Sequence, residues 1–118
     1  MNCIDICFNT VIEELDFIVG NTYYIYYIVF NNNDGFLRKL LPVEVKFVKK
    51  DVYYSWFEDS KGTNYRVTYG SRLAYGNIFK SIEDCIDSFN NTINNRIDLI
   101  KNESDKKINK LKSKLIKL

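Results

Sequence analysis

The last 38 residues, Ser81 to Leu118, carry a single periodic pattern that no Gly or Pro interrupts. A continuous helix of this length would extend roughly 57 Å, farther than a domain built from the first 80 residues could cover. The sequence therefore predicts one long amphipathic helix whose apolar side needs a partner. Only Ser104 interrupts its apolar stripe, which recurs every three or four residues at Ile82, Ile86, Phe89, Ile93, Ile97, Ile100, Ile108, Leu111, Leu115 and Leu118.

The charges of this segment divide it into two parts. Ser81 is a suitable N-cap, and Glu83 and Asp84 in the first turn suit the positive end of the helix dipole. Residues 101–118 contain seven lysines and two acidic residues, a net charge of +5, so that residues 1–100 carry −3 of the total of +2. We expect residues 1–100 to form a single α+β domain that includes the first half of the helix. Residues 101–118 are expected to be its basic extension.

The apolar stripe of the extension is the predicted partner-binding or dimer site. Three occupants remain open at this stage: a second copy of the chain in a coiled-coil homodimer, a short N-terminal helix of the same chain, or a different protein. The residues expected to make this contact are Ile100, Ile108, Leu111, Leu115 and Leu118.

The first 80 residues predict strands joined by tight turns. Thr22–Phe30 is apolar on both faces, so we expect it to be covered on both sides. Pro42 is expected to end the segment before it, and Thr10 with Glu13 has capping-box spacing for a short helix to about Phe17, although a strand also fits. Further strands are predicted at Val43–Val48, Val52–Glu58, Tyr65–Tyr69 and Asn77–Lys80. The predicted fold is α+β: a small antiparallel β meander or barrel of 4–5 strands followed by one long C-terminal helix.

The residues that most enzymes use are scarce. The chain has no His and no Gly-rich phosphate loop, and its acidic pairs, Glu13-Glu14 and Glu83-Asp84, are adjacent residues that would point about 100° apart on a helix. The three cysteines, Cys3, Cys7 and Cys85, lack metal-binding spacing. We therefore expect no catalytic residues, no metal, no cofactor and no enzymatic activity. The free thiols and the lack of a signal peptide or a membrane span favour a cytoplasmic protein without a membrane role.

Nucleic-acid binding is the alternative function. Basic and aromatic side chains on the predicted sheet, together with the lysines of the helix tip, would suit a surface that stacks bases and contacts phosphates. The net acidic body and the presence of only four arginines weigh against it. The candidate residues are Lys46, Tyr53, Arg66, Lys106, Lys107, Lys110 and Lys114.

Two motifs resemble those of a loose group of small proteins encoded by phages and mobile elements. The opening motif is Gly20-Asn21-Thr22-Tyr23-Tyr24-Ile25, and the closing motif runs from Asn77 to Cys85, with Asp84 and Cys85 where the group usually has Glu and Ala. The resemblance covers Asp16 to Asn90 and implies a small Src-homology-type barrel. It also implies a non-enzymatic protein-binding module that inhibits a bacterial defence complex, in the manner of anti-CRISPR proteins, by binding and blocking.

Overall fold

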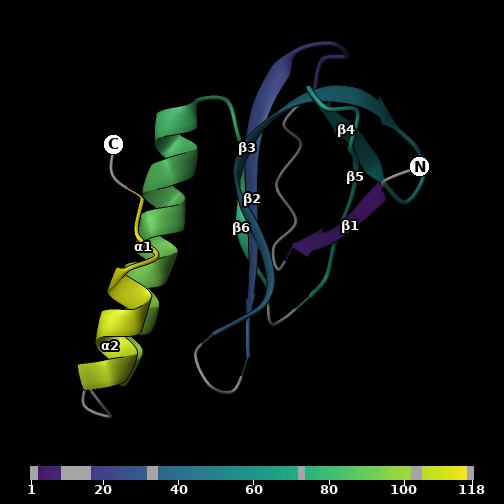
Figure 1. The fold of residues 1–118 in the computed structure, drawn as a ribbon. Coiled ribbons are helices and arrows are strands. Elements are labelled where there is room, and N and C mark those ends of the chain that lie inside the picture. Colours follow the sequence, from purple (N-terminus) through teal and green to yellow (C-terminus); the bar gives the residue numbers. More distant parts are fainter. Residues whose placement is uncertain (1–2, 9–16, 32–34, 72–73, 102–104, 117–118) are drawn as a thin grey trace.

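The computed structural model describes residues 3–8, 17–31, 35–71, 74–101 and 105–116, without the side chains of residues 100 and 105–108. These residues form one sheet and two helices (Figure 1). The elements are β1 (Cys3–Phe8), β2 (Thr22–Phe30), β3 (Phe36–Lys50), β4 (Ser55–Asp59), β5 (Asn64–Tyr69), β6 (Ala74–Phe79), α1 (Ile82–Ile100) and α2 (Asp105–Lys112).

The sheet has the strand order β1-β5-β4-β3-β2-β6. Strands β2 to β5 form the expected antiparallel meander, β6 returns to pair with β2, and β1 pairs in parallel with β5. The sheet is strongly curved but not closed (Figure 1). The α+β class is therefore confirmed, whereas the expectation of four or five strands was wrong because the described residues form six.

The additional strand is β1, at a position where no strand was predicted. Ile6 and Phe8 point into the protein and are buried, while Asp5 lies on the opposite face. Its parallel pairing with β5 joins residues about sixty positions apart, which local patterns do not reveal. The predicted helix between Thr10 and Phe17 lies almost entirely outside the described residues.

Pro42 does not end a strand, contrary to expectation. It lies within β3, where the register shifts between the pairs Ile25–Val43 and Tyr27–Leu40. This shift leaves Leu41 and Pro42 without a regular partner, and such a bulge tolerates a residue that cannot donate a ladder hydrogen bond. One long strand consequently bends around the core.

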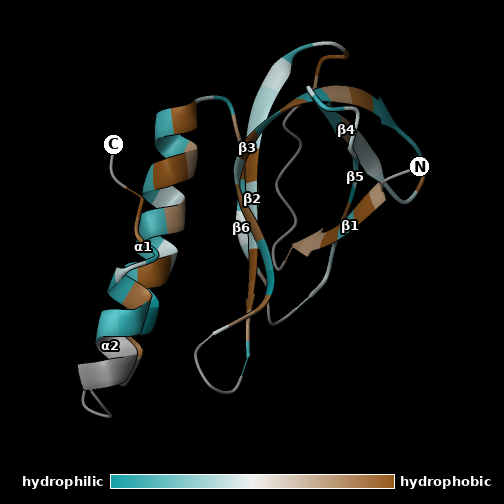
Figure 2. Ribbon diagram, in the orientation of Figure 1, coloured by the Kyte–Doolittle hydropathy of each residue, from teal (hydrophilic) through white to brown (hydrophobic). Residues whose placement is uncertain are grey.

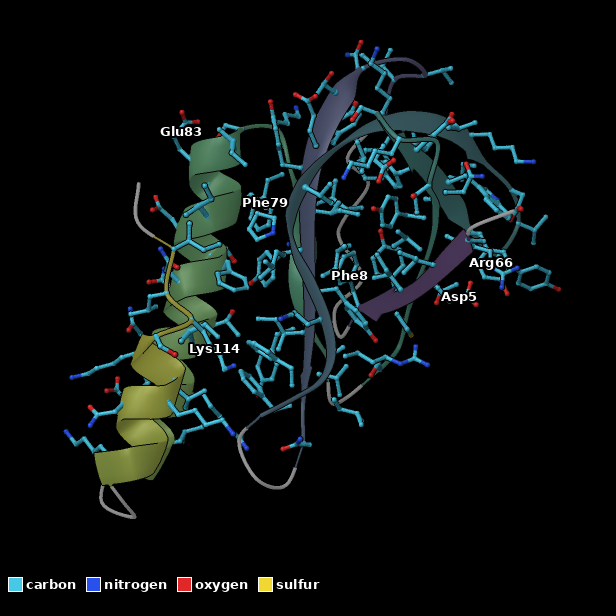
Figure 3. All side chains as sticks on the ribbon, in the orientation of Figure 1. Asp5, Phe8, Arg66, Phe79, Glu83 and Lys114 are labelled. Atoms are coloured by element: carbon cyan, nitrogen blue, oxygen red, sulfur yellow. The ribbon has the colours of Figure 1, made fainter. Side chains whose placement is uncertain are left out.

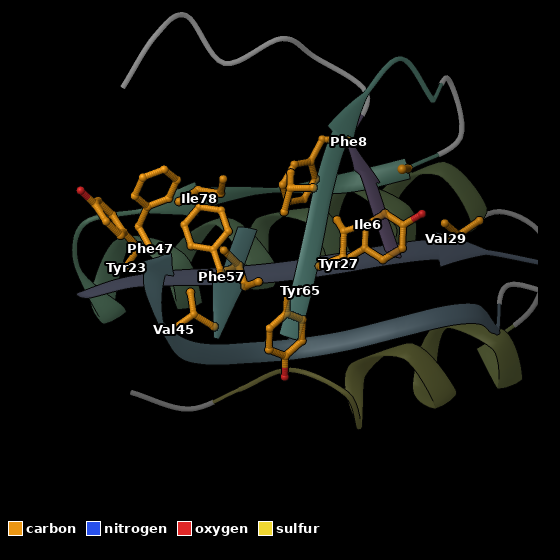
Figure 4. Packing of buried hydrophobic residues seen from close by; sticks show 13 residues of the cluster. Ile6, Phe8, Tyr23, Tyr27, Val29, Val45, Phe47, Phe57, Tyr65 and Ile78 are labelled. Carbon is orange, nitrogen blue, oxygen red and sulfur yellow. The ribbon is translucent and has the colours of Figure 1, made fainter. Parts of the chain in front are cut away.

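Two hydrophobic cores lie on the two sides of the sheet. The inner core, inside the curve, contains Tyr23, Ile25 and Tyr27 of β2 together with residues of all the other strands (Figure 4). The helix-side core places Tyr26 and Ile28 of β2 against the helices. Figure 2 shows the apolar residues that recur along β2 and α1. The prediction that β2 is covered on both faces is confirmed.

The predicted single long helix is wrong, because the chain forms two helices that pack side by side (Figure 1). Helix α1 begins where predicted, and the hydroxyl of Ser81 accepts a hydrogen bond from the Asp84 amide at 3.2 Å. After α1 ends, α2 folds back, and Leu111, which is 1% exposed, joins the helix-side core with Phe89 and Ile93. Folding back buries apolar surface that a straight helix would expose to water. The described residues form no coiled coil.

Polar side chains fix the helices in place. The hydroxyl of Tyr26 on β2 lies 2.8 Å from Ser88 Oγ and 2.9 Å from Thr92 Oγ1 on α1. The amide of Asn90 donates to the Ile116 carbonyl at 2.5 Å and accepts from the Ile116 amide at 2.8 Å. The segment after α2 is thereby held along α1. Neither described helix combines the length and apolarity needed to cross a membrane.

Candidate protein-binding surface

The loop between β3 and β4 presents two of the most exposed large apolar side chains, Val52 at 90% and Tyr53 at 79%. Its conformation is fixed by Asp51, whose carboxylate accepts from the backbone amides of Tyr53 at 2.9 Å and Tyr54 at 2.7 Å. The same carboxylate accepts from the indole Nε1 of Trp56 at 2.9 Å. One acidic side chain therefore orders both the loop and the aromatic ring beside it.

A row of side chains continues from this loop across four strands on the outer face of the sheet. The pairing register places Asp5 of β1 opposite Arg66 of β5, Arg66 opposite Trp56 of β4, and Trp56 opposite Lys49 of β3. The Arg66 guanidinium lies 4.6 Å from the ring centroid of Tyr54 and 5.7 Å from that of Trp56, and Lys49 Nζ lies 5.1 Å from the Trp56 ring. These cation–π contacts stack the side chains into a continuous layer.

We call this layer the aromatic surface and define it as Val52, Tyr53, Tyr54, Trp56 and Arg66. Its charges are balanced at its edges. Arg66 Nε donates to Asp5 Oδ1 at 2.5 Å, which holds the pKa of Asp5 below its usual value. Hydrogen bonds from Trp56 and from two backbone amides lower the pKa of Asp51. At neutral pH the two carboxylates are therefore ionised, and their negative charges offset the positive charges of Arg66 and Lys49.

A pocket of about 200 Å³ adjoins the aromatic surface. Tyr54, Arg66 and Asp5 line one part of it, and Arg38, from the first half of β3, lines another. A hollow beside exposed aromatic groups can accept a side chain of a bound partner.

The structure separates the predicted nucleic-acid residues. Tyr53 and Arg66 belong to the aromatic surface, where Arg66 is paired with Asp5. Lys46 is exposed on β3 opposite Glu58, beside a pocket that Glu44 and Asp59 also line. Lys110 is exposed on α2, and Lys114 lies half-buried beyond its end. The side chains of Lys106 and Lys107 are outside the described residues.

The side chains of the predicted partner-binding stripe that the structure describes are packed against other residues of the same chain. Leu111 belongs to the helix-side core and Leu115 packs against it. Neither the side chains of Ile100 and Ile108 nor any part of Leu118 is described. Whether the stripe also contributes to a dimer stays a prediction.

The cysteines differ in exposure but form no cluster. Cys85 is fully buried on α1, and burial raises the pKa of its thiol to about 12, which keeps it protonated. Cys3 is exposed and Cys7 is half-buried, and both are free. In the described part of the chain, no three His, Cys, Asp or Glu side chains gather as they would around a metal ion.

Sequence reasoning missed Asp51, Tyr54, Trp56 and Asp5 as site residues. A signal for part of this site was present, because an aspartate directly before a run rich in Tyr and Trp can form an Asx turn that displays the rings. The register that brings Asp5 to Arg66 depends on the unpredicted strand β1.

Acid is expected to disorder the aromatic surface before it unfolds the protein. Because the pKa of Asp51 is lowered in the fold, its hydrogen bonds are at full strength above the ordinary value of 3.8 and are lost as the pH falls through the lower, folded value. Trp56 is the only tryptophan, so its fluorescence reports this site alone. Emission should change below about pH 3.8 while far-ultraviolet circular dichroism stays native. Asp51→Ala should reduce that transition to the part contributed by Asp5, whose pKa is also lowered and whose partner Arg66 lies over the Trp56 ring. An unchanged transition in this variant would contradict the assignment.

Comparisons with known proteins identify no relative. No family model matches the chain, and searches of curated proteins and of solved structures find no significant match.

Proposed function

We propose that this protein is a non-enzymatic protein-binding module that acts through the aromatic surface. The observation that carries the proposal is the exposed Tyr53, held in place by the Asp51 hydrogen bonds. Tyr, Trp and Arg are the residues most enriched at the energetic centres of protein interfaces. A loop that is ordered before binding also loses less conformational entropy when the partner arrives.

The charge of the aromatic surface favours a protein partner over a nucleic acid. Arg66 is paired with Asp5, and Lys49 interacts with the Asp51 carboxylate, so these two cations are compensated; Arg38 adds positive charge only at the adjoining pocket. Binding to a phosphate backbone depends on uncompensated cations. A protein interface instead favours aromatic groups with satisfied polar partners around them.

The proposed mode of action is blocking by occupancy. In this mode the module binds a larger assembly and covers a surface that the assembly needs. The resemblance to phage-encoded proteins supplies the first candidates to test, which are bacterial defence complexes of the RNA-guided type. The aromatic surface supports the binding step, and the choice of target rests on the resemblance.

Tyr53→Ser is expected to weaken partner binding by about 2 kcal/mol, or roughly thirtyfold, because interface tyrosines at energetic centres carry losses of this size. The matched control is Leu99→Ser on α1, since Leu99 is also a large exposed side chain, at 71%. Purified candidate defence complexes would be titrated with each variant by calorimetry, and their target cleavage assayed in parallel. Weaker binding by the Leu99 variant than by the Tyr53 variant would contradict the proposal.

A further inference from the structure

The folding back of α2 brings cations from distant parts of the chain to one pair of aromatic rings. Phe30 of β2 and Phe36 of β3 are stacked with ring centroids 5.8 Å apart. Lys114 Nζ, from the segment after α2, lies 4.7 Å from the Phe36 centroid, and Lys39 Nζ of β3 lies 5.4 Å from the same ring. The guanidinium of Arg96 on α1 lies 5.0 Å from the Phe30 centroid.

Among the described side chains, no carboxylate forms a salt bridge with Lys39 or Lys114. A carboxylate partner would neutralise a lysine, whereas an aromatic ring orients the ammonium group and leaves its charge available. The one salt bridge between described side chains, Asp5–Arg66, is on the other side of the molecule from Lys114 (Figure 3). We call Lys39 and Lys114 the basic surface.

Aromatic groups extend from the basic surface toward the edge of the sheet. Tyr75 of β6 is 42% exposed, and its ring lies 5.7 Å from that of Phe30. The order Tyr75, Phe30, Phe36 therefore places an exposed ring at one end of an aromatic row and lysines at the other. Interleaved aromatic and cationic side chains are the pattern by which proteins hold single-stranded nucleic acid, with bases on rings and phosphates on lysines.

We propose that the basic surface binds single-stranded nucleic acid, with Lys39 and Lys114 contacting phosphates and Tyr75 stacking on a base. The site is independent of the aromatic surface proposed for protein binding. It keeps Lys114 of the helix tip expected from the sequence but not the expected sheet face, because Arg66 is paired with Asp5 and Lys46 lies among Glu44, Glu58 and Asp59.

The test compares two double variants of equal charge. Lys39→Gln with Lys114→Gln removes two cations from the basic surface, and Lys46→Gln with Lys61→Gln removes two exposed cations elsewhere. Binding of fluorescein-labelled single-stranded DNA and RNA of mixed sequence would be measured by anisotropy over a salt series. For the first variant we expect roughly tenfold weaker binding and a salt slope reduced by about 1.4, the value for two lost phosphate contacts. The control should bind as the wild type does.

A third variant, Tyr75→Ser, should weaken binding roughly fivefold or more without changing the salt slope, because stacking carries no charge. Circular dichroism establishes that each variant is folded. Equal weakening of the two double variants would overturn the proposal, since net charge alone would then explain binding. Undetectable binding by the wild type would also overturn it. Competition by polyglutamate as strong as that by the nucleic acid would assign the surface to an acidic protein instead. Tyr53→Ser should leave nucleic-acid binding unchanged, so the two proposals fail separately.

Discussion

Replacing Gly76 by alanine is expected to lower the free energy of unfolding by roughly 3–5 kcal/mol, a large fraction of the stability of a small domain. Gly76 lies on β6 with φ of +142°, where L-residues are strained. A Cβ atom there would overlap the carbonyl oxygen of Tyr26 and lie 2.8 Å from Cε1 of Phe8. The Tyr26 oxygen belongs to the backbone of the neighbouring strand, so it cannot move without disturbing the β2–β6 pairing.

Gly70→Ala is the matched control for this substitution. Gly70 has φ of +124°, so alanine there suffers comparable backbone strain, but no atom lies within 4 Å of the added Cβ. Urea unfolding of the two variants therefore separates the contact from the strain. We expect the Gly70 variant to lose only about 1–3 kcal/mol. Equal midpoints for the two variants would contradict the close approach of β6 to β2 and Phe8.

The parts of the fold that were predictable from the sequence depend on local patterns. The two-sided apolar run of Thr22–Phe30 indicated a strand covered on both faces, and Ser81 with its acidic first turn located the start of α1. The strand β1 and the bulge at Pro42 depend instead on pairing with distant residues. The stripe in residues 101–118 showed that apolar surface needs burial, but its period fits a straight helix and a folded-back pair equally well.

The candidate sites also contain residues that local patterns reveal and residues whose contacts depend on distant parts of the chain. Exposed Tyr53 and the paired Arg66 were selected from alternation along single strands, which shows the face of a side chain and not its neighbours. The order imposed by Asp51 is local and could be anticipated from its position before the aromatic run. The meeting of Lys39 with Lys114 on Phe36 could not be anticipated, because it depends on α2 folding back onto α1.

Replacing Leu111 by aspartate is expected to detach α2 from α1. Leu111 is fully buried in the helix-side core, and an unpaired carboxylate there would lose its hydration without gaining a partner, at a cost of several kcal/mol. An isolated helix as short as α2 does not persist in water. Because α2 supplies 8 of the 27 residues in the described helices, the helical circular dichroism signal should fall by about a third.

Asn109→Asp is the control, because Asn109 is exposed on the same helix and the substitution adds the same charge. The Asn109→Asp variant should keep the helical circular dichroism signal. An equal loss of this signal in both variants would show that added charge on α2, and not burial of Leu111, detaches the helix. Hydrogen exchange provides a second measurement, since release of α2 should also expose the Ile116 amide that now donates to Asn90.

Light scattering separates packing within one chain from dimerisation. Packing within the chain predicts a monomer mass for wild type and variant alike, whereas a dimer held by this stripe predicts a mass that falls by half on substitution.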